Sequence, residues 1–250
     1  AIWGGWGINS SGVCVVRVLG VVANTHDSGI ALLNNGVPEF VFEEERFNRV
    51  KRTMRFPEQS LKAAFEGTGL ELGDIAAITT PWDVARLRRS FAGIMASNLP
   101  SSLNLMHSRA HVAQRNQIVV LNQYIRRNFK KYFGGGKLPP LINVGHHDAH
   151  AAVFFVSPFE EAHVLVMDGY GDDASSSAYF GRGNRLERQW STPILNSLGL
   201  VYSVVTEYLG FSGFGDEGKA MALAAFGGPT YVARFRDLVH TTDDGGYAVN

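Results

Sequence analysis

Short apolar runs alternate with polar, glycine-containing turns along most of the chain. Residues 15–23 are rich in β-branched side chains, which predicts a buried strand. The apolar runs 30–33 and 40–42 flank Asn34-Asn35-Gly36, a sequence typical of a tight hairpin turn. Further strands are predicted over 74–80, 141–144, 164–167 and 175–180. The last two of these runs are expected to pair across the loop between them.

Helical patterns separate these runs. Pro57 at a first helical position opens a predicted helix that ends near Gly67, with Leu61, Ala64 and Phe65 on its inner face. The charged piece 43–52 is expected to leave the sheet as a loop or a short helix. Other helices are predicted over 101–133, 198–209 and 220–225, the last opened by Asp216 and rich in small residues that allow close packing. Strands that alternate with helices indicate an α/β fold.

The composition is that of an ordinary globular protein, with 45% apolar and 18% charged residues in 250. This length allows one large α/β domain or two small ones. The formal net charge is +0, so no global field favours nucleic acid or anionic lipid, and we expect neither a nucleic-acid nor a membrane partner. Cys14 is the only cysteine, which excludes an internal disulfide and favours a reducing, cytoplasmic setting.

Both ends of the chain look cut, which suggests a fragment. The chain begins with Ala1 in a piece rich in glycine and tryptophan, and it closes at a hairpin-like turn, 245–250. We expect residues 1–15 to be an irregular segment and residues 16–250 to form the folded part.

Two histidines and an aspartate stand where a metal site would be expected. His146 and His150 are four residues apart, so a helix would place both imidazoles on one face. Asp168 ends an apolar run and would lie at a strand tip, where open α/β sheets place their chemistry. Two imidazoles and one carboxylate suit Zn²⁺ or Fe²⁺ and leave positions open for a substrate oxygen. The plain alternative is a polar helix N-terminus beside a buried strand.

A second histidine pair, His107 and His111, has the same spacing but no acidic partner nearby. Arg109 and Arg115 would repel a cation. We expect a polar helix face there rather than a metal site.

The turn after the strand is Asp168-Gly169-Tyr170-Gly171. Glycine lets backbone N–H groups approach phosphate oxygens closely. With the order of strands, turns and helices before it, this turn suggests an α/β domain of the actin-like ATPase/sugar-kinase (ASKHA) fold, in which Gly169 and Gly171 contact a nucleotide. An ordinary tight hairpin would have the same local sequence.

Several segments taken in order are far more specific than any one of them. They are Thr25-His26-Asp27-Ser28-Gly29-Ile30-Ala31-Leu32, 43–51, 146–150, the Asp168 loop, 198–211 and Asp216-Glu217-Gly218-Lys219-Ala220-Met221-Ala222-Leu223-Ala224. This series resembles the O-carbamoyltransferase family of antibiotic and nodulation-factor biosynthesis over roughly residues 16–228. Related domains occur in tRNA-threonylcarbamoyl transferases.

The resemblance implies an enzyme that makes carbamoyladenylate from carbamoyl phosphate and ATP and passes the carbamoyl group to a hydroxyl of a natural product. It also implies that residues 16–250 are the first part of an actin-like domain. The second half of that domain and a C-terminal adenylate-forming domain would then be absent from this chain, and a further aspartate ligand would lie beyond Asn250.

Individual roles also follow from the resemblance. His146, His150 and Asp168 match ligands of a metal, usually iron, with Zn²⁺ left open and Mg²⁺ as a further candidate ion. His26 and Lys51 match positions that contact the carbamoyl or phosphate part of the substrate. Glu217 and Lys219 resemble nucleotide contacts of the threonylcarbamoyl relatives.

The residue types fit this chemistry. His26 is a reasonable general base for the acceptor hydroxyl, and Lys51 would stabilise charge on the leaving phosphate. The plain alternatives are a turn-capping histidine and a solvated basic loop. His147 is expected to neighbour the site with its side chain off the ligand face, and Asp148 to orient a ligating imidazole.

Two other functions remain open from the sequence. One is a kinase or other phosphoryl transferase of the same fold, although such kinases usually hold Mg²⁺ through phosphates and carboxylates rather than two histidines. The other is a non-catalytic module that binds metal and nucleotide. The sequence leaves the acceptor and the oligomeric state undetermined.

Overall fold

A computed structural model describes residues 7–8, 14–100, 118–243 and 245–250. The chain divides into two compact units, Ala1–Val144 and Gly145–Asn250, and each is described by itself. Within the described ranges, no helix is both long enough and apolar enough to span a membrane.

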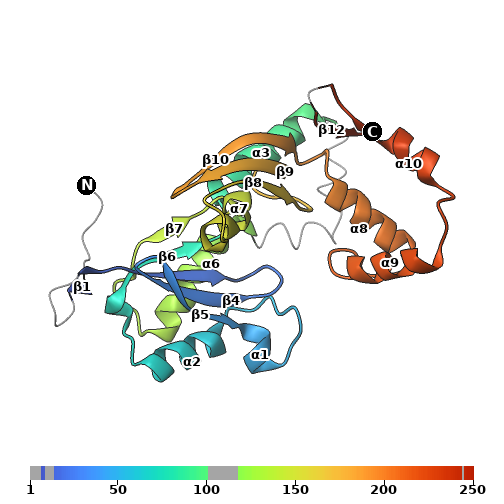
Figure 1. The fold of residues 1–250 in the computed structure, drawn as a ribbon. Coiled ribbons are helices and arrows are strands. Elements are labelled where there is room, and N and C mark those ends of the chain that lie inside the picture. Colours follow the sequence, from blue (N-terminus) through green and yellow to red (C-terminus); the bar gives the residue numbers. More distant parts are fainter. Residues whose placement is uncertain (1–6, 9–13, 101–117, 244) are drawn as a thin grey trace. The chain divides into compact units, whose positions relative to one another are not determined.

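The first unit is built on a mixed sheet of five strands in the order β5-β4-β3-β6-β7 (Figure 1). Antiparallel pairing joins β3 (Arg17–Val22), β4 (Gly29–Asn34) and β5 (Val37–Glu43), whereas β6 (Ile75–Thr80) and β7 (Leu141–Asn143) run parallel to β3. These strands confirm the predicted α/β class and the predicted hairpin.

The hairpin turns at Asn35 and Gly36, whose φ angles are 52° and 83°. Both angles lie in the left-handed region that asparagine and glycine tolerate, which explains why this dipeptide sets the strand pairing. Before the sheet, β1 (Gly7–Ile8) and β2 (Cys14–Val15) form a short antiparallel pair within the stretch that we expected to be irregular.

Helices α2 (Glu58–Thr68) and α6 (Leu121–Tyr132) each bury one apolar face in the first unit. The predicted inner face of α2 is confirmed, since Leu61, Ala64 and Phe65 are buried. Pro57 precedes α2 as its N-cap rather than lying in its first turn. A long helix was expected over 101–133. Its C-terminal part is confirmed by α6, and residues 101–117 lie outside the described part of the chain.

A buried carboxylate closes the start of α2. Glu44 belongs to α1 (Glu44–Asn48) and accepts hydrogen bonds from the backbone N–H groups of Gln59 and Ser60, at 3.1 and 2.8 Å, and from the Ser60 hydroxyl at 2.7 Å. Negative charge is favourable at a helix N-terminus, so Glu44 fixes α2 to the loop that carries Lys51. Among the described residues of this unit, the other helices are η1 (Leu72–Asp74) and α3 (Val84–Ser97), and the sequence analysis did not predict α3.

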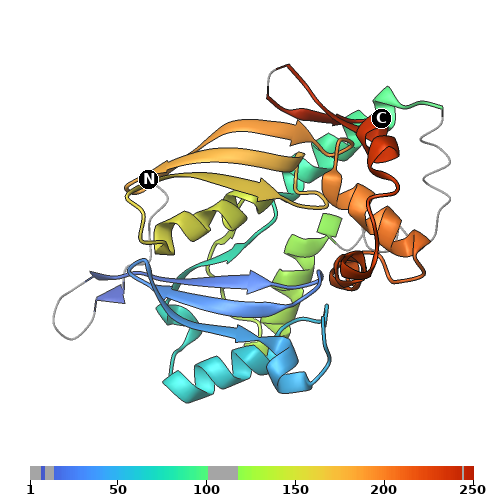
Figure 2. The same ribbon diagram turned by 45° about the vertical axis from the view of Figure 1, so that its right-hand side comes forward.

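The second unit contains a three-stranded antiparallel sheet in the order β10-β9-β8. The predicted pairing is confirmed, with Met167 of β8 (Glu161–Met167) opposite Ser176 of β9 (Ala174–Arg182). Strand β10 (Arg185–Pro193) was not predicted. Helix α7 (His146–Ala151) and the 3₁₀ helix η2 (Ala152–Val156) lie on one face of this sheet (Figures 1 and 2).

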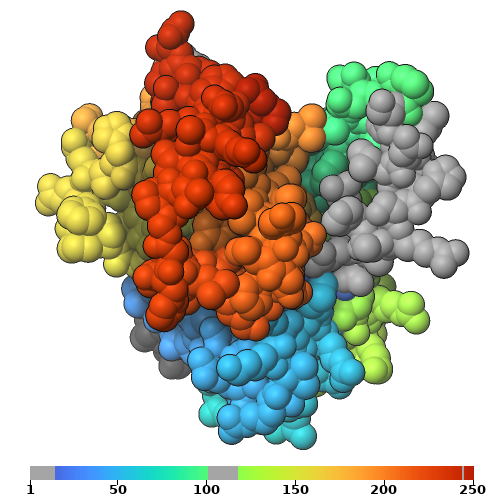
Figure 3. Space-filling model, turned by 90° about the vertical axis from the view of Figure 1, so that its right-hand side faces the viewer, coloured from blue at the N-terminus to red at the C-terminus, as the bar shows by residue number. Residues whose placement is uncertain are grey.

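The unit continues with helices and a hairpin at its C-terminal end. These are α8 (Leu198–Tyr208), α9 (Glu217–Leu223), η3 (Ala224–Phe226), α10 (Val232–Leu238), β11 (Val239–Thr241) and β12 (Tyr247–Val249). Helix α8 and the opening of α9 at Asp216 are confirmed, but only Ala220 of the small-residue stretch is buried. Figure 3 shows α8–α10 in orange and red, a surface on which Phe226 and Tyr231 are largely exposed.

Candidate metal centre

Helix α7 places His146 and His150 on one face, one turn apart. The helix begins at His146 after an extended Gly145, and the His146 backbone N–H donates a hydrogen bond to Asp172 Oδ2 at 2.7 Å. The two imidazole rings are 4.7 Å apart, nearly perpendicular at 89°, and their Nε2 atoms are 3.3 Å apart. The spacing predicted from the sequence is therefore realised in the helix.

Asp168 reaches the same point from the end of β8. Its Oδ2 lies 2.8 Å from His146 Nε2 and 3.6 Å from His150 Nε2. Its Oδ1 accepts a hydrogen bond from the Gly169 N–H at 2.6 Å, which fixes the carboxylate plane. One donor atom from each of the three residues lies within 4.8 Å of the others.

These separations fit a metal ion. Ligand bonds of about 2.0–2.2 Å in a tetrahedral site place neighbouring donor atoms about 3.3–3.6 Å apart. The observed separations of 2.8, 3.3 and 3.6 Å span this range, so small side-chain movements would complete the set. The side chain of His150 is 53% exposed, which leaves the site open to a substrate on that side. The residues present therefore suit one metal ion with open coordination positions.

The electrostatics of Asp168 also suit a ligand. Burial raises the pKa of its carboxyl, but hydrogen bonds with His146 and His150 and with the Gly169 N–H outweigh this effect and hold the pKa well below its usual range. The carboxylate is therefore ionised at neutral pH, as a metal ligand must be.

His147 connects α7 to β9, and its side chain points away from the face that carries His146 and His150, as expected. It is 4% exposed, and its Nδ1 hydrogen-bonds Ser177 Oγ of β9 at 2.8 Å, while Nε2 has no partner among the described residues. Burial, with His146 next to it, lowers the pKa of His147 to about 4. The close approach of Gly171 to this ring requires glycine, because a Cβ there would lie 2.8 Å from His147 Cδ2.

Asp148 Oδ1 accepts a hydrogen bond from the hydroxyl of buried Tyr179 at 2.8 Å, and its expected role in orienting a ligating imidazole stays a prediction. Burial, reinforced by Asp148, raises the pKa of Tyr179 and keeps its hydroxyl protonated as the donor. Asp173, from the loop after Asp168, forms two 3.0 Å hydrogen bonds with Arg188 of β10. The sequence analysis missed the supporting roles of Ser177, Tyr179, Asp173 and Arg188. The three consecutive serines 175–177 in a predicted strand were a signal, because buried hydroxyl groups need polar partners on a neighbouring element.

The start of α8 holds the Asp168 loop in place. Ser197 caps α8 and donates from its hydroxyl to the Gly169 carbonyl oxygen at 2.6 Å. A Cβ on Gly199 would lie 2.6 Å from the Asp168 carbonyl oxygen. Gly169 thus contacts Ser197 and Gly171 packs against His147. Their expected contact with a nucleotide stays a prediction.

Glu217 and Lys219 lie at the start of α9. Glu217 accepts hydrogen bonds at 2.6 Å from Ser203 of α8 and from the Phe214 N–H. Burial raises the pKa of Glu217, but these hydrogen bonds lower it by more, so the net shift is downward. Lys219 forms a 2.8 Å ion pair with Asp216. Glu217 therefore ties α9 to α8, and the nucleotide-binding role of both residues stays a prediction.

His26 and Lys51 belong to the first unit, on two loops that are bonded to each other. The backbone N–H groups of Asn24 and Ser28 donate to Met54 and Thr53 at 3.0 Å each. His26 is exposed, and its Nδ1 lies 2.8 Å from Asp27 Oδ2. The structure thus brings the two loops of the expected catalytic pair together within one unit. The pair His107 and His111 lies outside the described residues.

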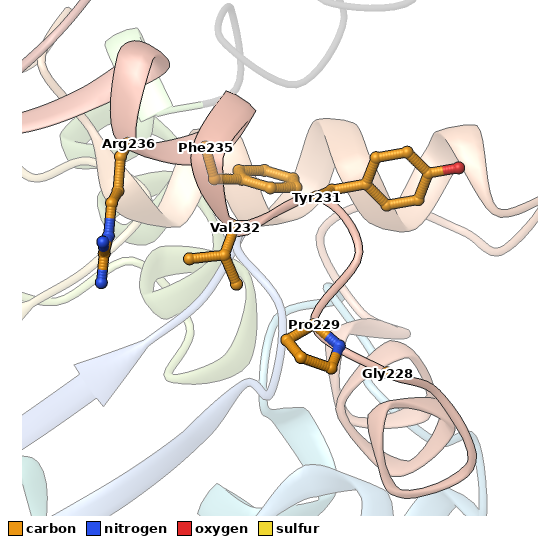
Figure 4. Close-up of a pocket in the computed structure, with 6 residues that line it drawn as sticks. All are labelled: Gly228, Pro229, Tyr231, Val232, Phe235 and Arg236. Atoms are coloured by element: carbon orange, nitrogen blue, oxygen red, sulfur yellow. The ribbon is translucent and has the colours of Figure 1, made fainter.

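An apolar hollow near the C-terminal end of the chain differs in character from the metal centre. It has a volume of about 490 Å³ and is lined by Pro229, Tyr231, Val232 and Phe235. In Figure 4 the Phe235 ring lies near Val232, whereas the Tyr231 ring points away from them. Arg236 is the only charged residue of this hollow among those described, so the hollow offers no donor set for a metal.

Comparison with known proteins identifies the family. Residues 17–250 match the carbamoyltransferase N-terminus, so the chain belongs to the carbamoyltransferase family of transferases. The nodulation protein NolNO of Sinorhizobium fredii is 31% identical over 227 residues, which cover 90% of this chain and 31% of NolNO. The nodulation protein NolO of Bradyrhizobium diazoefficiens is 39% identical over 109 residues, which cover 43% of this chain and 20% of NolO.

An uncharacterised protein of Synechocystis is 34% identical over 244 residues, which cover 94% of this chain and 39% of that protein. The chain thus spans between 31 and 39% of the length of the two relatives that it matches over most of its own length.

Proposed function

We propose that this chain is part of a metal-assisted O-carbamoyltransferase that uses carbamoyl phosphate and ATP, through carbamoyladenylate, to carbamoylate a hydroxyl of a secondary metabolite. The observation that carries the proposal is the convergence of His146, His150 and Asp168 in a chain of the carbamoyltransferase family. A plain helix cap would not need three donor atoms within 4.8 Å of one another.

The three residues would hold Fe²⁺ or Zn²⁺. When bound, such an ion supplies positive charge that stabilises negative charge developing on phosphate oxygen. The protein contributes the ionised Asp168, two imidazoles fixed on α7, and the half-exposed His150 edge through which a substrate would enter.

His26 would act as the general base. Its Nδ1 lies 2.8 Å from the Asp27 carboxylate, so a proton on Nδ1 is favoured and Nε2 is left as the acceptor. Nε2 would accept the proton of the acceptor hydroxyl as that oxygen attacks the carbamoyl carbon of carbamoyladenylate, and AMP would leave with the electron pair of the broken carbon–oxygen bond. Such catalysis typically contributes about 10²- to 10⁴-fold in rate.

Lys51 would bind the phosphate group that leaves. Four of the non-glycine residues with positive φ lie on the two loops that carry His26 and Lys51, namely Asn24, Asp27, Arg49 and Arg52. Left-handed backbone at residues other than glycine costs energy and is concentrated at functional sites. This strain supports the choice of these loops as a substrate-binding region.

The strand order supports an ASKHA fold for this part of the chain. Each unit contains three consecutive antiparallel strands in the same order, β3-β4-β5 in the first and β8-β9-β10 in the second. On this interpretation ATP would bind near the Gly169–Gly171 turn, with Glu217 and Lys219 as candidate contacts.

Metal analysis tests the centre of the proposal. We expect about one ion per chain in the wild type and almost none in the His146→Ala/His150→Ala variant, with elemental analysis naming the ion. The His163→Ala/His240→Ala variant is the matched control, because it also removes two histidines of the second unit. Equal metal in wild type and both variants, with all three folded, would reject the ligand assignment.

Turnover tests the reaction in the gene product that contains this chain. Carbamoyl phosphate, ATP and a hydroxylated acceptor should give pyrophosphate and a carbamoylated product. Release of ADP with a phosphorylated acceptor would instead establish a phosphoryl transferase of the same fold.

A further inference from the structure

The formal net charge of +0 hides an uneven distribution of charge along the chain. Residues 84–147 contain ten of the 23 lysines and arginines and none of the 23 aspartates and glutamates. The rest of the chain therefore has 13 basic and 23 acidic residues, a net charge of −10. We expected no nucleic-acid partner from the net charge of the whole chain, but a charge asymmetry of this size is itself typical of proteins that bind a polyanion.

Four of these cations cover the exposed side of α6. We call them the basic face, and they are the exposed residues Arg126, Arg127, Lys130 and Lys131. The opposite side of the helix is apolar and buried, with Leu121, Ile125 and Phe129. At a rise of about 1.5 Å per residue, the four cations lie within about 8 Å along the helix axis. Residues four apart are neighbours on a helix surface, so the cations form two adjacent rows.

The charge of the basic face is not neutralised by ion pairs in the part of the chain that the structure describes. None of its four cations is paired with a carboxylate there. Like charges four residues apart destabilise a helix, and solvated helix faces usually carry charges of both signs. The helix dipole compensates for the two lysines in the last turn, but not for Arg126 and Arg127, which lie farther from the C-terminus. The excess positive charge therefore suits an anionic partner.

Helix α3 adds positive charge beside the start of α6. Arg88 of α3 donates from Nη2 to the carbonyl oxygen of Val119, two residues before α6 begins. The adjacent Arg89 is exposed and has no ion pair among the described residues. Arg86 differs, because Asp83 pairs with it at 3.5 Å. The cationic surface is thus shared by two helices of the first unit.

The other residues of α6 indicate which polyanion fits. No large apolar residue is exposed between Leu121 and Tyr132, whereas protein–protein interfaces have an apolar core. Helices that bind membrane surfaces turn an apolar face to the lipid, but the apolar face of α6 is buried within its unit. Unpaired bases stack on exposed aromatic rings, and the rings of α6 are buried or partly buried. A duplex backbone needs only cations, so it fits best.

We propose that the basic face binds the phosphate backbone of a nucleic-acid duplex without sequence preference. The proposal does not rest on carbamoyl transfer. A duplex carries about one negative charge per 1.7 Å of its axis, so four cations over about 8 Å of α6 can each meet a phosphate. Each such contact releases counterions, which makes the affinity depend steeply on salt.

Fluorescence anisotropy of a labelled RNA duplex, titrated with the gene product that contains this chain, provides the test. The logarithm of the association constant should fall linearly with the logarithm of the salt concentration between about 50 and 200 mM. At about −0.9 per phosphate contact, four contacts give a slope of about −3 to −4. A second duplex of unrelated sequence should bind with the same affinity, and no binding at about 50 mM salt would overturn the proposal.

Variants identify α6 as the place of binding. Arg127→Ala/Lys131→Ala should weaken binding at least about tenfold and make the salt slope shallower by about 2. Arg234→Ala/Arg236→Ala is the matched control, because it removes two exposed arginines from α10 in the second unit. The control should bind as the wild type does. Equal affinities of the two double variants, with both folded by circular dichroism, would reject the basic face as the binding site.

Two further probes and the metal variant separate the alternatives. Polyglutamate stands for an acidic protein, and vesicles of phosphatidylcholine with phosphatidylserine stand for a membrane. If either probe bound more tightly than the duplex and lost this binding in Arg127→Ala/Lys131→Ala, the nucleic-acid assignment would be wrong. His146→Ala/His150→Ala should bind the duplex normally while it loses metal, so failure of the metal assignment and failure of duplex binding are separate results.

Discussion

His147 stands between two candidate metal ligands, yet its own chemistry is that of a buried structural residue. Its ring is enclosed against Ser177 and Gly171, and burial lowers its pKa to about 4, against about 6.5 in an unfolded chain. As the pH falls from 7, the unfolded chain therefore takes up a proton before the folded one does. This linkage removes stability between about pH 6.5 and pH 4.

We predict that His147→Asn flattens the pH dependence of unfolding. Asparagine retains a polar group near the position of Nδ1 for Ser177 but does not titrate. Urea unfolding at several values between pH 4 and pH 7 should show the wild type losing a few kcal/mol more than the variant over this window. The measured quantity is the slope of the free energy of unfolding against pH. A loss of stability that is the same at every pH therefore does not affect it. Parallel curves for the two proteins would contradict the assigned pKa.

The convergence of His146, His150 and Asp168 could be predicted from the sequence because each position depends on local geometry alone. A spacing of four on a helix and a position at the end of a strand are visible without knowing the partner elements. Tyr179 and Ser177 were missed because their contacts with Asp148 and His147 depend on which face of β9 meets α7. That face is set by strand register, which a one-residue slip would reverse.

At the scale of elements, the first turn of α8 supports the loop that carries the candidate metal ligand Asp168. Gly199 allows α8 to contact the Asp168 backbone, and a Cβ there would lie 2.6 Å from the Asp168 carbonyl oxygen and 2.7 Å from the Gly169 nitrogen. Backbone atoms have no alternative rotamer, so the helix or the loop would have to move. The position of Asp168 thus depends on an element about thirty residues later in the chain.

We predict that Gly199→Ala destabilises the chain by about 1–3 kcal/mol and weakens metal binding about tenfold or more. Gly218→Ala is the matched control, since Gly218 is also the second residue of its helix and a Cβ there meets nothing within 4 Å. The control should be neutral or stabilise the helix by up to about 1 kcal/mol. Urea unfolding and a metal titration measure both effects. Equal behaviour of the two alanine variants would show that α8 does not hold the loop.

The elements that the sequence analysis missed have a common physical cause. Strand β10 reads Arg-Leu-Glu-Arg-Gln-Trp-Ser-Thr-Pro, with most of its side chains exposed at the edge of the sheet, so it lacks the apolar alternation of a half-buried strand. In α3, only Val84 and Leu87 are buried, and the basic run 86–89 obscured the capping signal of Asp83. The hairpin and α2 were predicted because each carries a strong local signal, an Asn-Gly turn and a continuous buried face.

At the scale of the whole molecule, the candidate chemistry is divided between the two compact units. The first carries His26 and Lys51 on mutually bonded loops, and the second carries the candidate metal ligands His146, His150 and Asp168. The basic loop 46–55 holds five lysine and arginine residues and no acidic one, which suits an anionic donor such as carbamoyl phosphate.

This division predicts that donor binding and metal binding can be lost separately. Lys51→Ala should weaken carbamoyl phosphate binding about tenfold, because a charge-assisted contact is lost, while the metal content stays at the wild-type level. Lys62→Ala is the matched control, since Lys62 is an exposed lysine of α2 in the same unit. Isothermal titration with carbamoyl phosphate and elemental analysis of the same samples measure the two properties. Equal affinities in the two lysine variants would remove Lys51 from the donor site, and loss of metal in Lys51→Ala would show that the two functions are not separate.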